Sequence, residues 1–471
     1  MLTSTRALQR IYSFLSLVAV PLLLLMLLVA GCGTNSGSGS SGSGQNTGSA
    51  FVIGTDAPVA SVASFNATIQ SLDAIDASGK SVSLVSGTPT VDFARYNGLQ
   101  TLIDMNNVPA DTYTQISVTF SSATIGYLQM QSGAPPTIQT MNASFTSPTA
   151  TVTLANPLVV SQTGPVGVRL DFRLDKSLQT SGGQITGEVT PTLDIEAVGP
   201  DDPGAYIDEF DAAVVNVDAS SQTFIVQGPH GRQWTINVNG NTEWDGGATL
   251  SDLSSTSIVQ ISGILDKADF TIEANEVAIL SQNGFYAAGL VTYVQPASGV
   301  ASDFDMYVRG TLPASGTGVT DGVEAQVDLS GQEQFSIYWM HNPFAHFLFN
   351  PSTLLPGQHV AVGGSASGAA NAQALSVDRV VLRHSGLNGT FVPGSIDLGN
   401  GTFQIQVNGF AGILIPQKVT VYCGPGTSFR FGLTGVGDIN SNTDLRVVGL
   451  LIKDPTTGKP DLLARYVDIL E

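Results

Sequence analysis

Hydrophobic and polar residues alternate with a period of two along several short stretches of the chain. Between residues 166 and 174 every second position is valine, leucine or phenylalanine, and glycine, arginine and aspartate lie between them. Residues 65–70 and 113–120 show the same alternation. A period of two buries one face of a strand and exposes the other face to solvent. These stretches therefore predict antiparallel sheets packed as a β-sandwich over residues 51–200.

The rest of the chain contains a unit that recurs three times. Each copy ends in two apolar runs, found at 257–265 with 274–280, at 358–364 with 377–382, and at 444–451 with 464–470. A glycine directly follows the apolar start of each first run, which predicts a bend where one strand serves two edges of a small barrel. Units of roughly 75–100 residues are too long for solenoid repeats. We therefore expect separate barrels in tandem over residues 207–282, 283–384 and 385–471.

Two further strands are expected in each unit. The opening strands are predicted at 223–226, 305–308 and 402–405, and the central strands at 234–238, 335–339 and 418–422. The run Asp201-Asp202-Pro203-Gly204 is predicted to link the sandwich to the repeats.

The composition supports an all-β fold and restricts the partners. Hydrophobic residues make up 42% of the 471 positions, which is enough for real cores. The 38 acidic residues outnumber the 18 lysines and arginines, giving a net charge of −20 without a basic cluster after the N-terminus. Nucleic-acid affinity depends largely on lysine and arginine contacts with phosphates, so no nucleic-acid partner is expected. An acidic chain is also repelled by anionic lipid head groups.

The N-terminus combines Arg6 and Arg10 with a long apolar run that ends in Val29-Ala30-Gly31-Cys32. This arrangement resembles a bacterial lipoprotein signal, which implies removal of residues 1–31 and a lipid on Cys32. The alternative is a transmembrane anchor, because about 20 apolar residues span a bilayer. Residues 32–50 would then form a lipidated cysteine and a flexible Gly/Ser tether. We expect an exported protein held at the bacterial cell envelope, and Gly33 favours the outer membrane by resemblance to enterobacterial sorting.

The folded segments resemble two families of exported proteins. Residues 51–196 carry the motifs Thr55-Asp56-Ala57-Pro58, Val91-Asp92-Phe93, Val108-Pro109-Ala110-Asp111-Thr112-Tyr113, Leu170-Asp171-Phe172 and Gly187-Glu188-Val189-Thr190-Pro191. They resemble domain-of-unknown-function family 4382, which implies a prealbumin-like β-sandwich without a known activity. Asp111 departs from the glycine that is usual in the family's turn. The repeats over 207–471 resemble domain-of-unknown-function family 5666, which implies OB-like barrels.

The sequence contains no H-E-x-x-H, G-x-S-x-G or G-x-x-x-x-G-K-[ST] motif, and its one G-x-G-x-x-G match, at residues 37–42, lies in the Gly/Ser tether without a flanking strand or helix. No catalytic residue, cofactor or metal site is therefore predicted. Once Cys32 is acylated only Cys423 remains, and we interpret it as a buried cysteine at the end of a strand. His341, His346 and His359 lie among aromatic residues, either as a metal or recognition site or, more simply, as parts of a packed strand and loop.

Residues 438–444 space their oxygen atoms like a calcium loop, but the glycine and the final glutamate of such a loop are missing. The simpler interpretation is a polar turn, and weak calcium binding between Asp438 and Asp444 stays open.

These features favour a cell-envelope lipoprotein that acts as a non-catalytic binding or structural module for an unknown protein or glycan ligand. The first alternative is an enzyme that acts on glycans or envelope polymers with paired carboxylates. The second alternative is an assembly partner of another envelope protein, which an exposed apolar patch would support.

Overall fold

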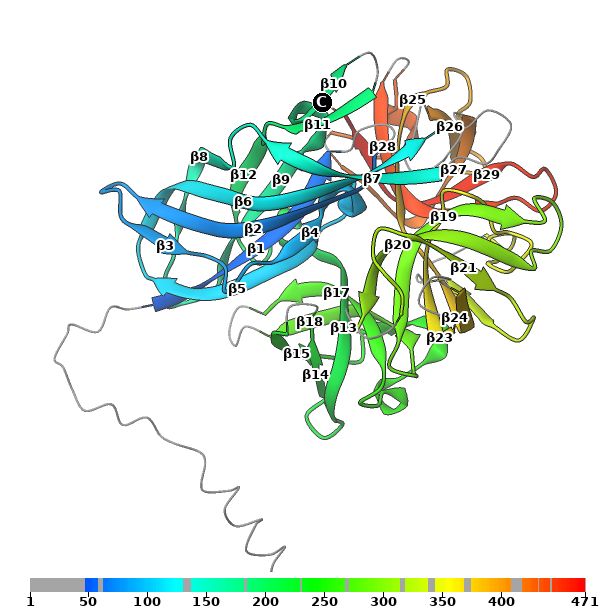
Figure 1. Ribbon diagram of the computed structural model, residues 1–471, viewed down its shortest axis with the longest axis horizontal. Helices are drawn as coiled ribbons and strands as arrows, with labels where there is room; N and C mark the ends of the chain where they lie inside the picture. Colours follow the sequence, from blue (N-terminus) through cyan, green and yellow to red (C-terminus); the bar gives the residue numbers. More distant parts are fainter. Residues whose placement is uncertain are drawn as a thin grey trace, which may run out of the picture. The chain divides into compact units, whose positions relative to one another are not determined.

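The period-two stretches of the N-terminal third form two β-sheets that face each other, drawn in blue through cyan to green in Figure 1. The structure is a computed structural model that describes residues 47–57, 62–129, 137–181, 184–228, 231–266, 271–313, 318–337, 344–367, 374–407, 417–430, 432–440 and 443–470. The predicted signal segment, Cys32 and most of the predicted tether lie outside these residues.

One sheet of the sandwich has the strand order β12-β9-β1-β5 and the other has β10-β11-β7-β6-β2-β3, with β4 and β8 paired to β2 and β6. The first consists of β1 (Thr47–Ala57), β5 (Thr101–Pro109), β9 (Val166–Arg173) and β12 (Leu193–Val198). The second consists of β2 (Val62–Asp76), β3 (Ser81–Ser83), β4 (Thr90–Asp92), β6 (Thr112–Gln129), β7 (Thr137–Phe145), β8 (Thr149–Val159), β10 (Leu178–Ser181) and β11 (Gln184–Val189). Short helical turns are η1 (Phe93–Tyr96) and α2 (Leu174–Ser177).

The sandwich core follows the alternation seen in the sequence. In β9 the side chains of Val168, Leu170 and Phe172 are fully buried, whereas the polar residues between them are not. The ring of Phe172 lies 4.9 Å from that of Phe65 on the opposite sheet, measured between centroids. Aromatic contacts of this kind stabilise the packing of the two sheets beyond the area that they bury.

Strand β1 begins earlier than the sequence indicated. The tether was predicted to reach Ala50, but β1 starts at Thr47, and both Ser49 and Ala50 are buried. Gly48 lies so close to the carbonyl oxygen of Ser161 that an added Cβ would collide with it. A small residue that reads as flexible linker is therefore required by the close approach of two backbones.

Three five-stranded barrels follow the sandwich, in green, yellow and orange to red in Figure 1. The first contains β13 (Ile207–Asp218), β14 (Thr223–Gln227), β15 (Gln233–Asn237), β17 (Ile258–Leu265) and β18 (Ile272–Ser281). The second contains β19 (Tyr286–Gln295), β20 (Asp303–Leu312), β21 (Glu324–Asp328), β23 (His359–Ser367) and β24 (Ala374–Arg383). The third contains β25 (Ser385–Phe391), β26 (Thr402–Val407), β27 (Gln417–Phe429), β28 (Asp444–Lys453) and β29 (Pro460–Ile469).

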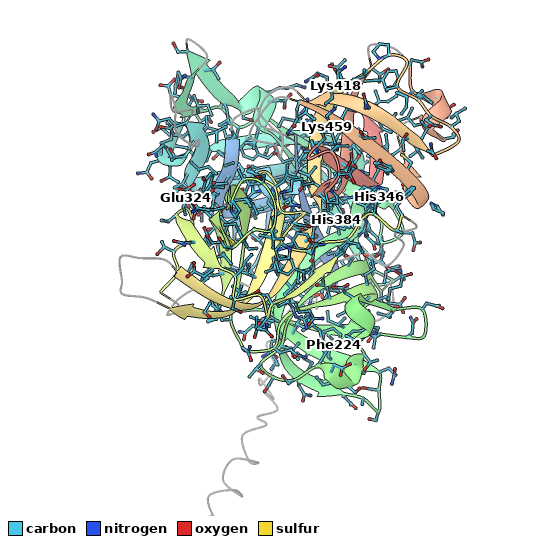
Figure 2. All side chains as sticks on the ribbon, turned by 90° about the vertical axis from the view of Figure 1, so that its right-hand side faces the viewer. Phe224, Glu324, His346, His384, Lys418 and Lys459 are labelled. Atoms are coloured by element: carbon cyan, nitrogen blue, oxygen red, sulfur yellow. The ribbon has the colours of Figure 1, made fainter. Side chains whose placement is uncertain are left out.

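The barrels share one topology. In each, the first four steps around the barrel are antiparallel, and a parallel pairing of the third strand with the fifth closes it: β15 with β18, β21 with β24, and β27 with β29. This is the order of an OB-like barrel. Phe224, labelled in Figure 2, is one of the large side chains buried inside the first barrel. The prediction of an all-β chain with a sandwich and three OB-like barrels is confirmed.

The predicted glycine bends are present in all three barrels. The register of the fourth strand shifts next to Gly263, Gly364 and Gly449. At each position an added Cβ would collide with the backbone of the fifth strand. The bulge bends the strand so that it pairs with two neighbours, and only glycine allows that close contact.

One predicted central strand was wrong. In the second barrel the third strand is β21, whereas residues 335–337 belong to β22 (Gln334–Ile337), which pairs with β24 beside the barrel. The first barrel has a counterpart in β16 (Glu243–Trp244), which pairs with β18. The apolar alternation of residues 335–337 misled the assignment, because the residues of β21 are mostly polar. The remaining short helices are η2 (Pro203–Ala205), η3 (Asp245–Gly247), η4 (Leu250–Asp252) and η5 (Val436–Asp438).

The barrels are not separate modules, as the tandem arrangement had suggested. Phe51 and Met105 of the sandwich lie in the same apolar core as the first barrel, and Leu450 of the third barrel lies in the core of the second. Tyr307 of the second barrel contacts Ala63 of the sandwich. The described residues from Thr47 onward accordingly form one compact unit.

A set of polar and charged side chains, mostly buried, joins the first barrel to the third, and the sandwich meets it where the backbone N–H of Gln100 donates to Asp208 at 2.9 Å. We call it the closed junction; its members are Asp208, Glu276, Arg430, Arg446, Arg465, Tyr466 and Asp468. Asp468 is fully buried and accepts two hydrogen bonds of 2.7 Å from Arg430. Arg465 donates to Glu276 at 3.0 Å, and Tyr466 donates to Asp208 at 2.6 Å.

Candidate functional site

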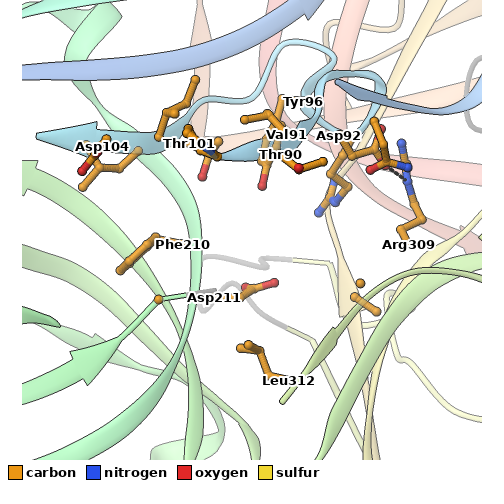
Figure 3. Close-up of a pocket in the computed structure, with 18 of the residues that line it drawn as sticks. Thr90, Val91, Asp92, Tyr96, Thr101, Asp104, Phe210, Asp211, Arg309 and Leu312 are labelled. Carbon is orange, nitrogen blue, oxygen red and sulfur yellow. Dashed lines mark hydrogen bonds and ion pairs between the residues drawn. The ribbon is translucent and has the colours of Figure 1, made fainter. Parts of the chain in front are cut away.

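A cavity of about 600 Å³ lies where the sandwich meets the first and second barrels (Figure 3). The sandwich contributes β4, η1 and the start of β5 to its wall, and the first barrel contributes Phe210 and Asp211 of β13. The second barrel contributes Arg309 and Leu312 at the end of β20. Three β assemblies that are distant in sequence therefore surround one space.

One part of the wall is apolar. Its side chains are Val91, Leu102, Ile103, Phe210, Trp234, Ala288 and Leu312. The rings of Phe210 and Trp234 meet edge to face, 6.1 Å apart and inclined by 83°. This wall is formed by residues that also belong to the cores, so the packing of the barrels fixes its shape.

Arg232 connects the first barrel to the sandwich at the edge of the cavity. Its Nη1 donates to Oδ1 of Asp104 at 2.6 Å and also to the carbonyl oxygen of Met105. Its guanidinium carbon lies 4.8 Å from the centre of the Trp234 ring, a cation–π contact. The side chain is 36% exposed, and all of its hydrogen bonds within the described part of the chain use Nη1. Nε and Nη2 have no hydrogen-bond partner among the described residues.

A buried ion cluster lies beside the cavity. Glu209 of β13 is fully buried and contacts both Arg95 of η1 and Arg383 of β24, the latter at 2.9 Å. Burial raises the pKa of Glu209, but Arg383 and Arg95 outweigh this and hold the pKa well below its usual value. Arg383 also donates to Asp211 at 2.6 Å. The glutamate is thus ionised and holds three β assemblies together.

Arg309 forms the polar end of the cavity. Its Nε donates to Oδ2 of Asp92 at 2.7 Å, the ion pair drawn as a dashed line in Figure 3. Its Nη1 lies 3.2 Å from Nε2 of His359. Its Nη2 is buried and has no hydrogen-bond partner in the described parts of the chain. The Arg309 side chain is only 6% exposed, so leaving this donor unpaired lowers the stability of the fold. A ligand atom that accepts a hydrogen bond from it would remove this penalty.

His359 is a neutral structural residue of this cluster. Burial, together with Arg95 and Arg309, lowers its pKa well below the usual value. Both ring nitrogens are engaged: Nδ1 lies 3.0 Å from Nη1 of Arg95 and 3.2 Å from the carbonyl oxygen of His384, and Nε2 lies 3.2 Å from Nη1 of Arg309. His359 is therefore not free to ligate a metal.

The histidines that sequence analysis grouped together are separated. His341 lies outside the described residues. His346 is exposed, and its ring centre lies 4.9 Å from that of Tyr422 at an inclination of 60°, whereas His359 lies in the buried cluster. Among the described residues no group of three or more histidine, cysteine or acidic side chains is placed to hold a metal ion.

Cys423 and the calcium-like loop have local roles. Cys423 lies within β27 rather than at its end, it is half-buried, and burial raises the pKa of its thiol to about 12. Asp438 accepts hydrogen bonds of 2.8 and 2.6 Å from the backbone and hydroxyl of Thr434. Asp444 accepts from Thr390 at 2.8 Å. The two carboxylates are engaged separately, and residues 441–442 between them lie outside the described residues.

Sequence analysis did not find the cavity residues Asp92, Arg95, Arg232, Arg309 and Arg383. One signal was available: the chain has twelve arginines, and several interrupt or follow apolar strands. Arg383, for example, follows the run Val380-Val381-Leu382. A charged residue in such a place indicates a buried partner from elsewhere in the chain.

Residues 47–191 match the family model described as "Domain of unknown function (DUF4382)". The match covers the sandwich and supports the resemblance of that segment to the family. The resemblance of the repeats to domain-of-unknown-function family 5666 stays a prediction. No curated protein matches the chain. None of the helices in the described ranges has the length and apolar character needed to cross a membrane.

Proposed function

We propose that the chain is an exported lipoprotein whose folded part is a non-catalytic binding module, and that the cavity is its binding site. The observation that carries this proposal is a cavity of about 600 Å³ with an apolar wall and converging arginines. Sites for small molecules have volumes of roughly 300–1,000 Å³ and combine apolar walls with a few placed polar groups.

The pairing of the carboxylates supports binding rather than catalysis. Four aspartates line the cavity, and three of them, Asp92, Asp104 and Asp211, are each bound to an arginine at 2.6–2.7 Å. The fourth, Asp321, has no arginine partner among the described residues, and burial raises its pKa. Catalysis by paired carboxylates needs two that can reach the substrate, and the arginines already engage three of the four. An enzyme with paired carboxylates therefore receives less support than a binding module.

An assembly role is supported less by the apolar surface. The exposed large apolar side chains come from all four β assemblies, which does not favour one docking patch. They are Val159, Val215, Val300, Val323, Leu348 and Leu398.

A lipid anchor on Cys32 is part of the proposal and has its own test. Cells that express the parent or the Cys32→Ser variant are fractionated. We expect the parent in the membrane fraction with residues 1–31 removed, and the variant released from it. A variant that stays in the membrane fraction after removal of residues 1–31 would contradict the anchor.

The binding role is tested by filling the cavity. Gly310 lines it, has open space around its Cα, and lacks a positive φ, so Gly310→Trp places an indole there without backbone strain. Gly240, in a turn outside the cavity lining, also has open space and serves as the control Gly240→Trp. Each full-length form, purified in detergent, is used to capture small molecules and glycans from envelope extracts. The parent and Gly240→Trp should retain a common component that Gly310→Trp loses; equal retention would contradict the proposed site.

A further inference from the structure

The guanidinium groups around the cavity offer more hydrogen-bond donors than the protein uses. Arg309 has a buried Nη2 without a partner, and Arg383 has a buried Nε without one. Arg232 uses only Nη1, so its Nε and Nη2 are unused among the described residues. Three of the four aspartates that line the cavity, Asp92, Asp104 and Asp211, are already bound to other nitrogens of the same arginines, and the fourth, Asp321, makes no ion pair with them.

We propose that the ligand of this cavity is a small organic anion, whose carboxylate or phosphate oxygens accept hydrogen bonds from Arg232 and Arg309. The inference rests on the proposed binding function and names the chemistry of its ligand. Nε and Nη2 of a guanidinium form a planar fork that matches two oxygens of a carboxylate or phosphate. Arg232 presents this fork, and Arg309 adds one further donor.

The distribution of charge supports an anion at this place. The chain has a net charge of −20, so an anion is repelled by most of its surface. The cavity lining differs from that surface, because four of the twelve arginines line it together with four aspartates, so its formal charges balance. The arginines are Arg95, Arg232, Arg309 and Arg383. An anion that enters gains charge-assisted hydrogen bonds where water is partly excluded.

The apolar wall defines the rest of the ligand. Phe210 and Trp234 form an edge-to-face pair beside Arg232, and both line the cavity. A ring or short carbon skeleton fits against such a surface while its charged group reaches the arginines. The ligand is thus an organic acid or a phosphate ester rather than an isolated inorganic ion.

Calorimetric titration of the full chain in detergent tests this chemistry. The probes are three anions, benzoate, D-galacturonate and D-glucose 6-phosphate, each with a neutral counterpart: benzyl alcohol, D-galactose and D-glucose. The variant is Arg232→Gln, which removes the charge and the fork at a partly exposed position. The control is Arg169→Gln, because Arg169 pairs with Glu196 on the sandwich and does not line the cavity.

At least one anion should bind about tenfold or more tightly than its neutral counterpart, as expected for a hydrogen bond to a charged group. Arg232→Gln should lose that preference and Arg169→Gln should keep it. Arg309→Lys, which keeps the charge but loses the buried Nη2, should weaken the same anion. The carboxylate and phosphate probes distinguish the two sources of the anionic group.

Three results would overturn the inference: binding of no anion, equal binding of an anion and its neutral counterpart, or an unchanged preference in Arg232→Gln. The proposed function fails separately, because it depends on whether Gly310→Trp loses the envelope component that Gly240→Trp retains. A neutral ligand blocked by Gly310→Trp would leave the binding function standing and remove only the anion.

Discussion

The cavity and the closed junction use the same residue types in different ways. At the closed junction each of the three guanidinium nitrogens of Arg465 has a partner, in Tyr466, Glu276 and Tyr206. Asp468 is held by Arg430 through two hydrogen bonds. At the cavity, by contrast, Arg309, Arg383 and Arg232 all keep unused donors.

The difference separates a structural role from a binding role. At the closed junction every buried side-chain nitrogen and oxygen of the member residues has a partner, whereas Arg309 and Arg383 at the cavity each keep a buried nitrogen without one among the described residues. A network whose buried groups are all paired fixes the positions of the β assemblies and offers a ligand no buried donor. A partly paired network beside a cavity costs stability, and that cost is removed when a ligand supplies the missing acceptors. The variants below alter one side of the comparison at a time.

Glu209→Gln should have the largest effect on stability. Arg95 loses its carboxylate partner among the described residues, while Arg383 loses one of two and keeps Asp211, so a buried cation is left without compensation. Removing one partner of a buried ion pair costs about 3–5 kcal/mol of unfolding free energy. Urea unfolding measures this loss of unfolding free energy. The control is Glu196→Gln, which removes an exposed ion pair with Arg169 that contributes under about 1 kcal/mol. Similar losses in the two variants would mean that the buried cluster does not hold the assemblies together.

Arg465→Met tests the closed junction in the same way. Glu276 and Asp208 lose their nearest buried cation while the apolar volume is roughly kept. We expect a loss of about 3 kcal/mol in urea unfolding. The variant should bind the anionic probes as the parent does, because Arg465 does not line the cavity. A loss of anion binding without a loss of stability would reverse the roles assigned to the two regions.

The pH dependence of stability should report on Asp208. Burial raises its pKa to about 6, although Arg465, Tyr466 and Arg430 oppose the rise. Because the folded pKa lies above the unfolded value, the ionised group destabilises the folded state above about pH 6, and this penalty declines as pH falls toward 4. When the pH falls from 8 to 5, the unfolding free energy of the parent should rise by roughly 1–2 kcal/mol more than that of Asp208→Asn. The check is urea unfolding of both proteins at the two pH values; parallel changes would show that Asp208 is not the group responsible.

Arg232→Gln should have the smallest effect on stability. Its ion pair with Asp104 is partly exposed, and such pairs contribute about 0.2–1 kcal/mol. Thermal unfolding of the variant should therefore stay close to that of the parent, even though anion binding is reduced. A large loss of stability would assign Arg232 to the structural network instead of the site.

Local patterns in the sequence predicted the fold well and the site poorly. The alternation around Phe172 and the bends at Gly263, Gly364 and Gly449 depend on neighbours in the chain, so the printed sequence contains them. The third strand of the second barrel was missed because β21 is mostly polar and Phe335 lies in the more apolar β22.

The cavity cluster depends on pairs that are far apart in sequence. Arg95 and Glu209 are separated by 114 positions, and Asp211 and Arg383 by 172. No local periodicity specifies which arginine meets which acid after three β assemblies come together. The sequence offered only the isolated arginines at strand ends as a signal, without their partners.

Diffraction from crystals of the protein soaked in bromide would test the central claim most directly. Bromide is an anion whose anomalous signal locates it without prior assumptions about the ligand. The account predicts a bromide site inside the cavity, within hydrogen-bond distance of Arg232 or Arg309, and none at Arg430 or Arg465. Bromide at the closed junction, or none in the cavity, would contradict the assignment of the cavity as the place where the protein binds an anion.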